Sequence, residues 1–197
     1  MKKKYSNGFS LIELLVFLAI IGVLGALAIP SFFETQKRNQ LSQMTEGIQA
    51  QAQLALQEAK TFNQPVILIW WGTEDRWPEG LQRGKIENQQ WIPLAKEWIF
   101  PEEVEFYLEE GYSTLLEVLK SQNLDNKLTA YKKPLFKIIE FYPSGRIDIG
   151  NTDAYLNNEL TLTMGLKNDL ENKEFKKMIF YSIHQKTGEF LLIDFKN

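Results

Sequence analysis

One carboxylate stands inside the most apolar stretch of the chain. The stretch GFSLIELLVFLAIIGVLGALAIP runs from Gly8 to Pro30, and Glu13 is its only ionisable residue. A charged side chain inside a bilayer is costly, and such residues usually pair with another charge or stay near the interface. Glu13 is therefore the residue whose chemistry most needs an explanation.

The rest of the chain offers few groups for catalysis. His184 is the only histidine, and it lies in the alternating segment IFYSIHQ out of phase with Ile183, which predicts a surface or rim position. The chain has no cysteine, which excludes disulfides, thiol nucleophiles and zinc–cysteine sites. No Ser-His-Asp or Cys-His arrangement is evident, so we predict that the chain is not an enzyme and has no catalytic residue.

Two acidic segments are candidates for cation binding. The first is EEVEFYLEE at 102–110, whose glutamates favour a solvated face over a metal site. The second is DIGNTDAYLNNE at 148–159, which contains oxygen ligands of the type that calcium prefers. Its spacing does not match an EF-hand loop, so no metal and no cofactor is predicted, and calcium binding at 148–159 stays open. The candidate ligands in this segment are Asp148, Asn151, Asp153 and Glu159.

The charge of the chain is distributed unevenly. The net charge is −3, and the lysines at positions 2–4 contribute +3, so the remainder carries about −6. Non-specific nucleic-acid binding needs a basic face. Nucleic acid is therefore an improbable partner.

Residues 1–30 allow three interpretations, of which the first two rest on length and composition and the third on a motif. A secretory signal peptide would have a basic start, an apolar core and a small-x-small cleavage site, for which GALA at 25–28 is suitable. However, the apolar run from Phe9 to Ile29 is long, and a helical pattern continues past it. A plain membrane anchor fits, since about 20 residues span a bilayer and the lysines place its start in the cytoplasm, but Glu13 is then unexplained.

The third interpretation comes from the motif Gly8-Phe9-Ser10-Leu11-Ile12-Glu13. It resembles the signal of type IV pilins and pseudopilins, which is a short basic leader ending in glycine, then a hydrophobic residue, with glutamate at the fifth position of the mature chain. Here the leader is 1–8, Phe9 is the new N-terminus and Glu13 is the fifth mature residue. Pro30 falls at the twenty-second mature position, where this family usually has a proline.

The resemblance implies a route of processing and assembly. A membrane-embedded prepilin peptidase cuts between Gly8 and Phe9 on the cytoplasmic side, and the new amino group of Phe9 is N-methylated. The chain sits in the inner membrane as a single-pass protein, with its head in the periplasm. It then joins a filament through its N-terminal helix, with other pilins or pseudopilins and an inner-membrane assembly platform as partners.

Two roles for Glu13 follow within this picture. Cleavage leaves it about 6 Å of helix rise from the new terminus, near the interface. In a filament of staggered helices it could neutralise the Phe9 ammonium of a neighbouring subunit, a pair that is stronger in low dielectric than in water. The alternative is an interfacial carboxylate that interacts with the helix dipole. We favour the intersubunit pair.

The apolar segment is expected to continue into a long amphipathic helix. We predict a helix over 9–62, with the membrane-spanning part at 9–29 and a possible kink at Pro30. Apolar residues then recur at intervals of three or four, which predicts one buried stripe against a globular head. The stripe contains Leu41, Met44, Ile48, Ala52, Ala55, Ala59 and Phe62.

Residues 63–197 are expected to form a β-rich periplasmic head, giving a pilin-like α+β fold. VILIWW at 66–71 reads as a buried strand, and LFKIIEFYPSGRIDIG at 135–150 reads as a hairpin. Further strands are predicted in 85–100, 100–108 and 158–164, and two more flank a turn at 186–188, with a short helix at 112–123.

The head carries a second, looser resemblance, to GspH/FimT-type minor pseudopilins. The segments Phe100–Val104 and Phe141–Arg146 and a terminal Thr-Gly-Glu turn follow one another in the order found in that family. The family usually has arginine after the last glycine, whereas this chain has Glu189, which argues against DNA binding of the FimT kind.

The sequence therefore predicts a minor pseudopilin at or near the tip of a type II secretion pseudopilus, supporting protein export. An alternative is a minor type IV pilin used for pilus assembly, adhesion, motility or DNA uptake. An alternative of another class is a membrane-anchored binding or enzymatic domain with a pilin-like leader.

Overall fold

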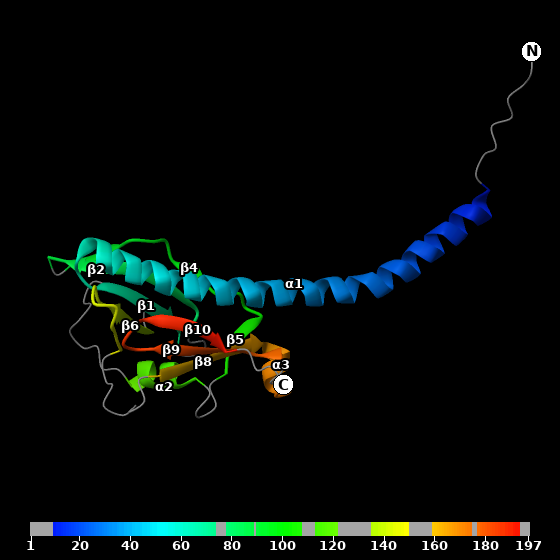
Figure 1. The fold of residues 1–197 in the computed structure, drawn as a ribbon. Helices are drawn as coiled ribbons and strands as arrows, with labels where there is room; N and C mark the ends of the chain where they lie inside the picture. Colours follow the sequence, from blue (N-terminus) through cyan, green and yellow to red (C-terminus); the bar gives the residue numbers. More distant parts are fainter. Residues whose placement is uncertain are drawn as a thin grey trace, which may run out of the picture. The chain divides into compact units, whose positions relative to one another are not determined.

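The computed structural model describes residues 10–73, 78–88, 90–107, 113–121, 135–149, 159–174 and 177–193. Contacts divide the chain into two compact units, residues 1–39 and residues 40–197. Helix α1 (Leu11–Phe62) contributes to both units (Figure 1). The α+β fold class predicted from the sequence is confirmed: the long N-terminal helix is joined to antiparallel sheets.

In the first unit, α1 has the length and composition of a membrane-spanning helix. Its most apolar window has a mean hydropathy of 2.7, and none of that window is buried. The helix continues through Pro30 rather than ending there. Proline cannot donate a backbone hydrogen bond, and next to it the Ser31 hydroxyl donates to the carbonyl of Ala28 at 2.9 Å.

The first sheet of the head has the order β3-β2-β1-β6-β7, and β4 also pairs with β2. The central strand β1 is buried along its whole length, which explains its uninterrupted apolar sequence VILIWWG. The hairpin predicted at 135–150 is present as β6 paired with β7. The strands are β1 (Val66–Gly72), β2 (Gly80–Glu87), β3 (Gln90–Pro93), β4 (Trp98–Ile99), β6 (Leu135–Phe141) and β7 (Ile147–Asp148).

The second sheet has the order β10-β9-β8-β5, and its pairs are antiparallel. The turn predicted at 186–188 joins β9 to β10. Two short helices complete the described head, α2 (Thr114–Ser121), which matches the helix predicted at 112–123, and α3 (Lys167–Glu171). The strands are β5 (Val104–Phe106), β8 (Glu159–Leu166), β9 (Ile179–His184) and β10 (Glu189–Ile193).

The second half of α1 packs on the head through the predicted stripe. From Leu41 to Ala59, the six predicted stripe residues are buried and belong to the main core. The prediction that Phe62 belongs to the buried stripe is wrong, because 43% of its surface is exposed. It is the last residue of the helix, and its ring lies under the Lys85 ammonium, 5.1 Å from the ring centroid, instead of entering the core.

Three elements differ from the sequence prediction. Strand β2 starts at Gly80 rather than within 85–100. The sequence prediction missed its first half because glycine usually weakens a strand. Here Gly80 and Gly84 are needed, since a Cβ at either position would collide with the Trp71 or Trp91 ring. Strand β5 is limited to Val104–Phe106, shorter than the predicted 100–108, and α3 was not predicted.

Polar contacts tie the second half of α1 to both sheets. The Arg83 guanidinium on β2 forms a two-point ion pair with Glu58 of α1, with Nε–Oε2 and Nη2–Oε1 distances of 2.5 and 3.1 Å, and it also donates to Gln51. On β9, the Tyr181 hydroxyl donates to the carbonyl of Thr45 at 3.1 Å. Burial raises the pKa of Tyr181 to about 12, so this hydroxyl keeps its proton.

The two turns that carry the looser family resemblance meet in space. Gly145 and Gly188 both have positive φ, 95° and 69°, where glycine is favoured. A Cβ on Gly188 would lie 2.9 Å from the carbonyl oxygen of Gly145. Beside them, the amide of Ile147 donates to the carbonyl of Gln185 at 2.7 Å, so the turns join one sheet to the other.

Candidate functional site at the start of the apolar helix

Glu13 closes a capping box at the first turn of α1. Its carboxylate Oε2 accepts a hydrogen bond from the Ser10 amide at 2.8 Å, and its own amide donates to Ser10 Oγ at 3.2 Å. This reciprocal pair satisfies two backbone donors that a helix start leaves open. Sequence reasoning missed the role of Ser10, although Ser-x-x-Glu before an apolar run is a known sign of such a box.

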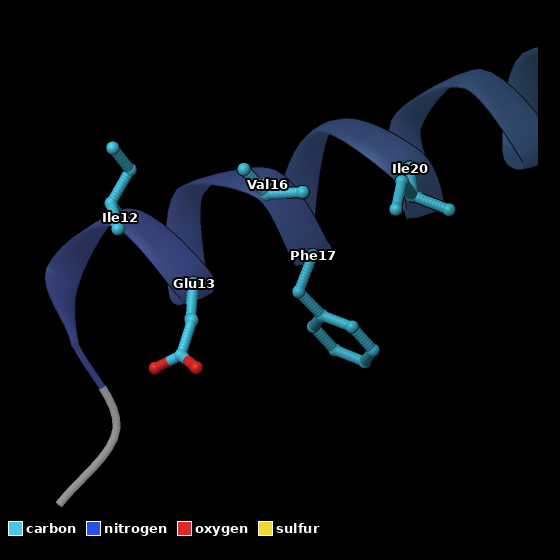
Figure 2. A pocket seen from close by; sticks show the side chains of 5 residues that line it. All are labelled: Ile12, Glu13, Val16, Phe17 and Ile20. Atoms are coloured by element: carbon cyan, nitrogen blue, oxygen red, sulfur yellow. The ribbon is translucent and has the colours of Figure 1, made fainter.

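Glu13 also borders a shallow hollow on the helix surface. The hollow is lined by Ile12, Glu13, Val16, Phe17 and Ile20. Figure 2 shows the Glu13 carboxylate and the Phe17 ring projecting from the same side of the helix, one turn apart. All five residues are exposed, and Glu13 is the only one with a polar side chain.

This arrangement can bind a positively charged group at one end of an apolar surface. A carboxylate accepts hydrogen bonds and attracts cations, and the attraction strengthens when water is absent. The described part of the unit 1–39 has its basic residues at Lys37 and Arg38, far along the helix from Glu13, and Arg38 pairs with Glu34 at 3.5 Å. Within the unit 1–39, a cation for Glu13 therefore has to come from residues 1–9, and otherwise it comes from outside this unit.

The sequence also singled out Pro30 for filament assembly and Gly8 and Phe9 for processing. Gly8 and Phe9 lie outside the described residues. Pro30 lies in α1, 17 residues after Glu13. Gly22 and Gly25 lie between Glu13 and Pro30 in the sequence. A Cβ added at either glycine would have nothing within 4 Å, so the helix surface at these two positions is open to another helix or to lipid.

The polar residues of the head that the sequence singled out have the following neighbours in the described ranges. His184 is half-buried, and its Nδ1 lies 3.2 Å from the Thr187 hydroxyl, which donates to Glu189. Most of the segment 148–159 lies outside the described residues, and Asp148 pairs with Arg146 at 3.3 Å. Within the described ranges, no three carboxylates or histidines are grouped to hold a metal ion.

Together, an apolar helix long enough to cross a membrane, a carboxylate near its start and an antiparallel β head give the chain a pilin-like architecture. Residues 3–29 match the family model described as the prokaryotic N-terminal methylation motif. The N-terminal segment of this chain therefore carries the methylation motif of type IV pilins and pseudopilins.

Two curated relatives show the extent of the likeness. The chain is 44% identical over 45 residues to the type IV major pilin protein PilA of Myxococcus xanthus, covering 23% of this chain and 20% of PilA. It is 44% identical over 43 residues to the fimbrial protein EcpC of Eikenella corrodens, covering 22% of this chain and 28% of EcpC. The matches thus span less than a third of either relative.

A solved structure gives a further comparison. The type IV minor pilin FimU of Pseudomonas aeruginosa aligns with a TM-score of 0.47 and 17% identity, over 81% of this chain and 92% of FimU.

Proposed function

We propose that the chain is a minor pseudopilin, a structural subunit at or near the tip of a type II secretion pseudopilus. The observation that carries the proposal is the N-terminal segment, in which the methylation motif covers 3–29 and Glu13 follows Phe9 at the fifth mature position. The β head supports the GspH/FimT-type assignment, because two of the three resembling segments, Phe141–Arg146 and the Thr-Gly-Glu turn, meet in space.

Processing prepares the chain for this role. A prepilin peptidase removes residues 1–8 in the inner membrane, and Phe9 becomes a methylated N-terminus. The apolar part of α1 holds the chain in the membrane before assembly, with its start in the cytoplasm and its head in the periplasm. The assembly platform then moves this helix from lipid into the filament.

Docking replaces one partner of Glu13 with another. In the free chain, the carboxylate is satisfied by the Ser10 amide of its own helix. In the filament, it meets the ammonium of a neighbouring Phe9, a charge that the bilayer interior does not otherwise offer. The capping box therefore lowers the cost of holding Glu13 in the membrane until a neighbour arrives.

The cleavage assignment predicts the effect of Gly8→Ala. Because the leaders that this segment resembles end in glycine, this variant should keep residues 1–8 when it is expressed with a prepilin peptidase. Intact-mass measurement of the membrane fraction checks this, and Asn7→Ala is the matched control that should still be cut. Normal removal of residues 1–8 from Gly8→Ala would contradict the assignment.

A minor type IV pilin is the second candidate function. It is favoured by the two curated relatives, which are named as a type IV major pilin and a fimbrial protein. DNA uptake fits poorly because the chain without its leader carries about −6. In addition, Glu189 stands where the FimT-type pattern has arginine, and its carboxylate accepts a hydrogen bond from Thr187.

One genetic experiment separates the two functions. Deleting the gene for this chain in its native host should reduce the exported proteins in the culture medium several-fold while surface pili remain. Supernatant proteomics and electron microscopy of the same cells provide the two readings. Loss of pili with normal export would support the pilus function and overturn the secretion function.

A further inference from the structure

Two carboxylates bracket an uncharged stretch of α1 whose length matches a bilayer. After Glu13 the next ionisable residue is Glu34, so the 20 residues at 14–33 carry no charge. At the rise of an α-helix they extend about 30 Å, which is the thickness of a hydrocarbon core. The window 9–29 has a similar length but places Glu13 about 6 Å inside it. The spacing of the charges therefore favours 14–33 as the stretch that lipid covers.

The C-terminal end of this stretch is suited to contact with lipid. The Ser31 hydroxyl donates to the carbonyl of Ala28 and the Thr35 hydroxyl donates to the carbonyl of Ser31, both at 2.9 Å. A polar group in hydrocarbon needs such an internal partner because water is absent. The Phe32 and Phe33 rings are 68% and 55% exposed, so lipid would remove two large apolar side chains from water. Both observations favour burial of the helix as far as Phe33.

A basic pair follows one turn beyond the two rings. The Arg38 guanidinium reaches back along the helix to Glu34, with a distance of 3.5 Å between Nη2 and Oε1. Helical side chains tilt toward the N-terminus in this way, which brings the charges of Lys37 and Arg38 toward the edge of the uncharged stretch. Two cations and one carboxylate leave this turn with a net charge of +1.

We propose that α1 crosses the membrane with residues 14–33 in the hydrocarbon, and that an outer girdle binds anionic phospholipid in the leaflet at the C-terminal end of this span. The outer girdle consists of Phe32, Phe33, Lys37 and Arg38. Its rings enter the edge of the hydrocarbon, and its net positive charge lies beside lipid phosphates. The inference rests on the membrane placement in the proposed function, but not on cleavage or on any filament.

Charge complementarity selects lipid over a second copy of the chain. A second helix at the same depth presents the same girdle with the same net charge of +1, and like charges repel. A lipid phosphate carries the opposite charge. One net positive charge near an anionic surface corresponds to a preference of about fivefold for anionic over neutral lipid at low salt.

The depth of two labels tests the placement. Because the chain has no cysteine, a fluorophore can be attached at Val23→Cys, near the middle of 14–33, or at Gln36→Cys, beside the girdle. Both positions are exposed. The full chain is reconstituted in vesicles of phosphatidylcholine and phosphatidylglycerol, and lipids with a nitroxide at the headgroup or at the chain end quench the labels. The Val23 label should be quenched from the chain end and the Gln36 label from the headgroup.

Removing both rings should shift the helix. With Phe32→Ala and Phe33→Ala together, 9–29 becomes the most apolar stretch, and its centre lies between four and five residues closer to the N-terminus. The Gln36 label should therefore move outward, away from the lipid, by about 7 Å. Phe17→Ala removes an exposed ring within the span, so it is the matched control and should leave the depth of the label unchanged.

Lipid preference is measured with the same Gln36 label. At equal mole fraction and low salt, nitroxide-labelled phosphatidylglycerol should be enriched around the label about fivefold over nitroxide-labelled phosphatidylcholine. High salt should reduce this preference. Lys37→Gln with Arg38→Gln should abolish it, whereas Lys60→Gln, an exposed basic residue near the other end of α1, should leave it intact.

The outcomes separate the girdle from the membrane placement. If neither nitroxide lipid quenches the Val23 label, the membrane placement fails and the girdle fails with it. If the Val23 label is quenched but the double phenylalanine variant does not move the Gln36 label, or phosphatidylglycerol shows no preference, the girdle is wrong and the membrane placement stands. Energy transfer between chains labelled at Gln36, in place of quenching by lipid, would assign this surface to a second copy and overturn the lipid partner.

Discussion

Replacing Glu13 by alanine is expected to leave cleavage intact and to reduce incorporation of the chain into filaments at least about tenfold. Cleavage needs the residues around Gly8, whereas docking needs a negative charge opposite the ammonium of Phe9. The attraction between the two charges is strongest where water is excluded, so its loss should dominate assembly. The measurement is the amount of mature chain in sheared filaments relative to the membrane fraction.

Glu13→Gln is the matched control for the role of this residue in the capping box. Glutamine can also occupy the last position of a capping box, so it keeps the hydrogen bond to Ser10 while it removes the charge. If docking depends on the charge, both variants assemble poorly. If Glu13 acts only as a helix cap, Glu13→Gln assembles as the unmodified chain does, and the intersubunit pair is wrong.

Removing the Arg83 guanidinium should destabilise the head by about 2–4 kcal/mol. Only 7% of the Arg83 side chain is exposed, and it holds the Glu58 carboxylate of α1 at two points. The Glu58 side chain is only 24% exposed, and Arg83→Met would leave its carboxylate without a cationic partner, which is a costly state for a charge. The test is urea unfolding in detergent followed by tryptophan fluorescence, since all five tryptophans lie in residues 70–98.

The double variant Arg83→Met with Glu58→Leu identifies the cause. It removes both charges and keeps apolar volume, so it should be more stable than Arg83→Met alone. Arg146→Met is the control, because Arg146 is 62% exposed and its pair with Asp148 should contribute little. Equal stability of Arg83→Met and the unmodified chain would contradict the role of this pair in holding α1 to the first sheet.

The regular elements of the fold could be predicted because they follow simple periods. The spacing from Leu41 to Ala59 indicated the buried stripe of α1, and the apolar run at 66–71 indicated a strand buried on both faces. The turns near Gly145 and Gly188 have the residues that such turns require. Long-range order was not predictable, because nothing local places β1 between β2 and β6.

The candidate site was predictable in part. Glu13 could be found because a charge in an apolar run is unusual, but its pairing with Ser10 emerged from the hydrogen bonds. The Arg83–Glu58 pair has no sequence signal, because its partners are 25 residues apart on different elements. The glycines of β2 misled the prediction. They are needed because tryptophan rings from neighbouring strands occupy the space that a Cβ would take.

The mass of the mature chain isolated from its native host tests the central claim most directly. The account predicts a chain that lacks residues 1–8 and begins with a methylated Phe9. A chain that still begins at Met1 would indicate a plain membrane anchor, and a chain cut after Ala28 would indicate a secretory signal peptide. Either result would contradict the assignment of Glu13 as a docking residue next to a new N-terminus.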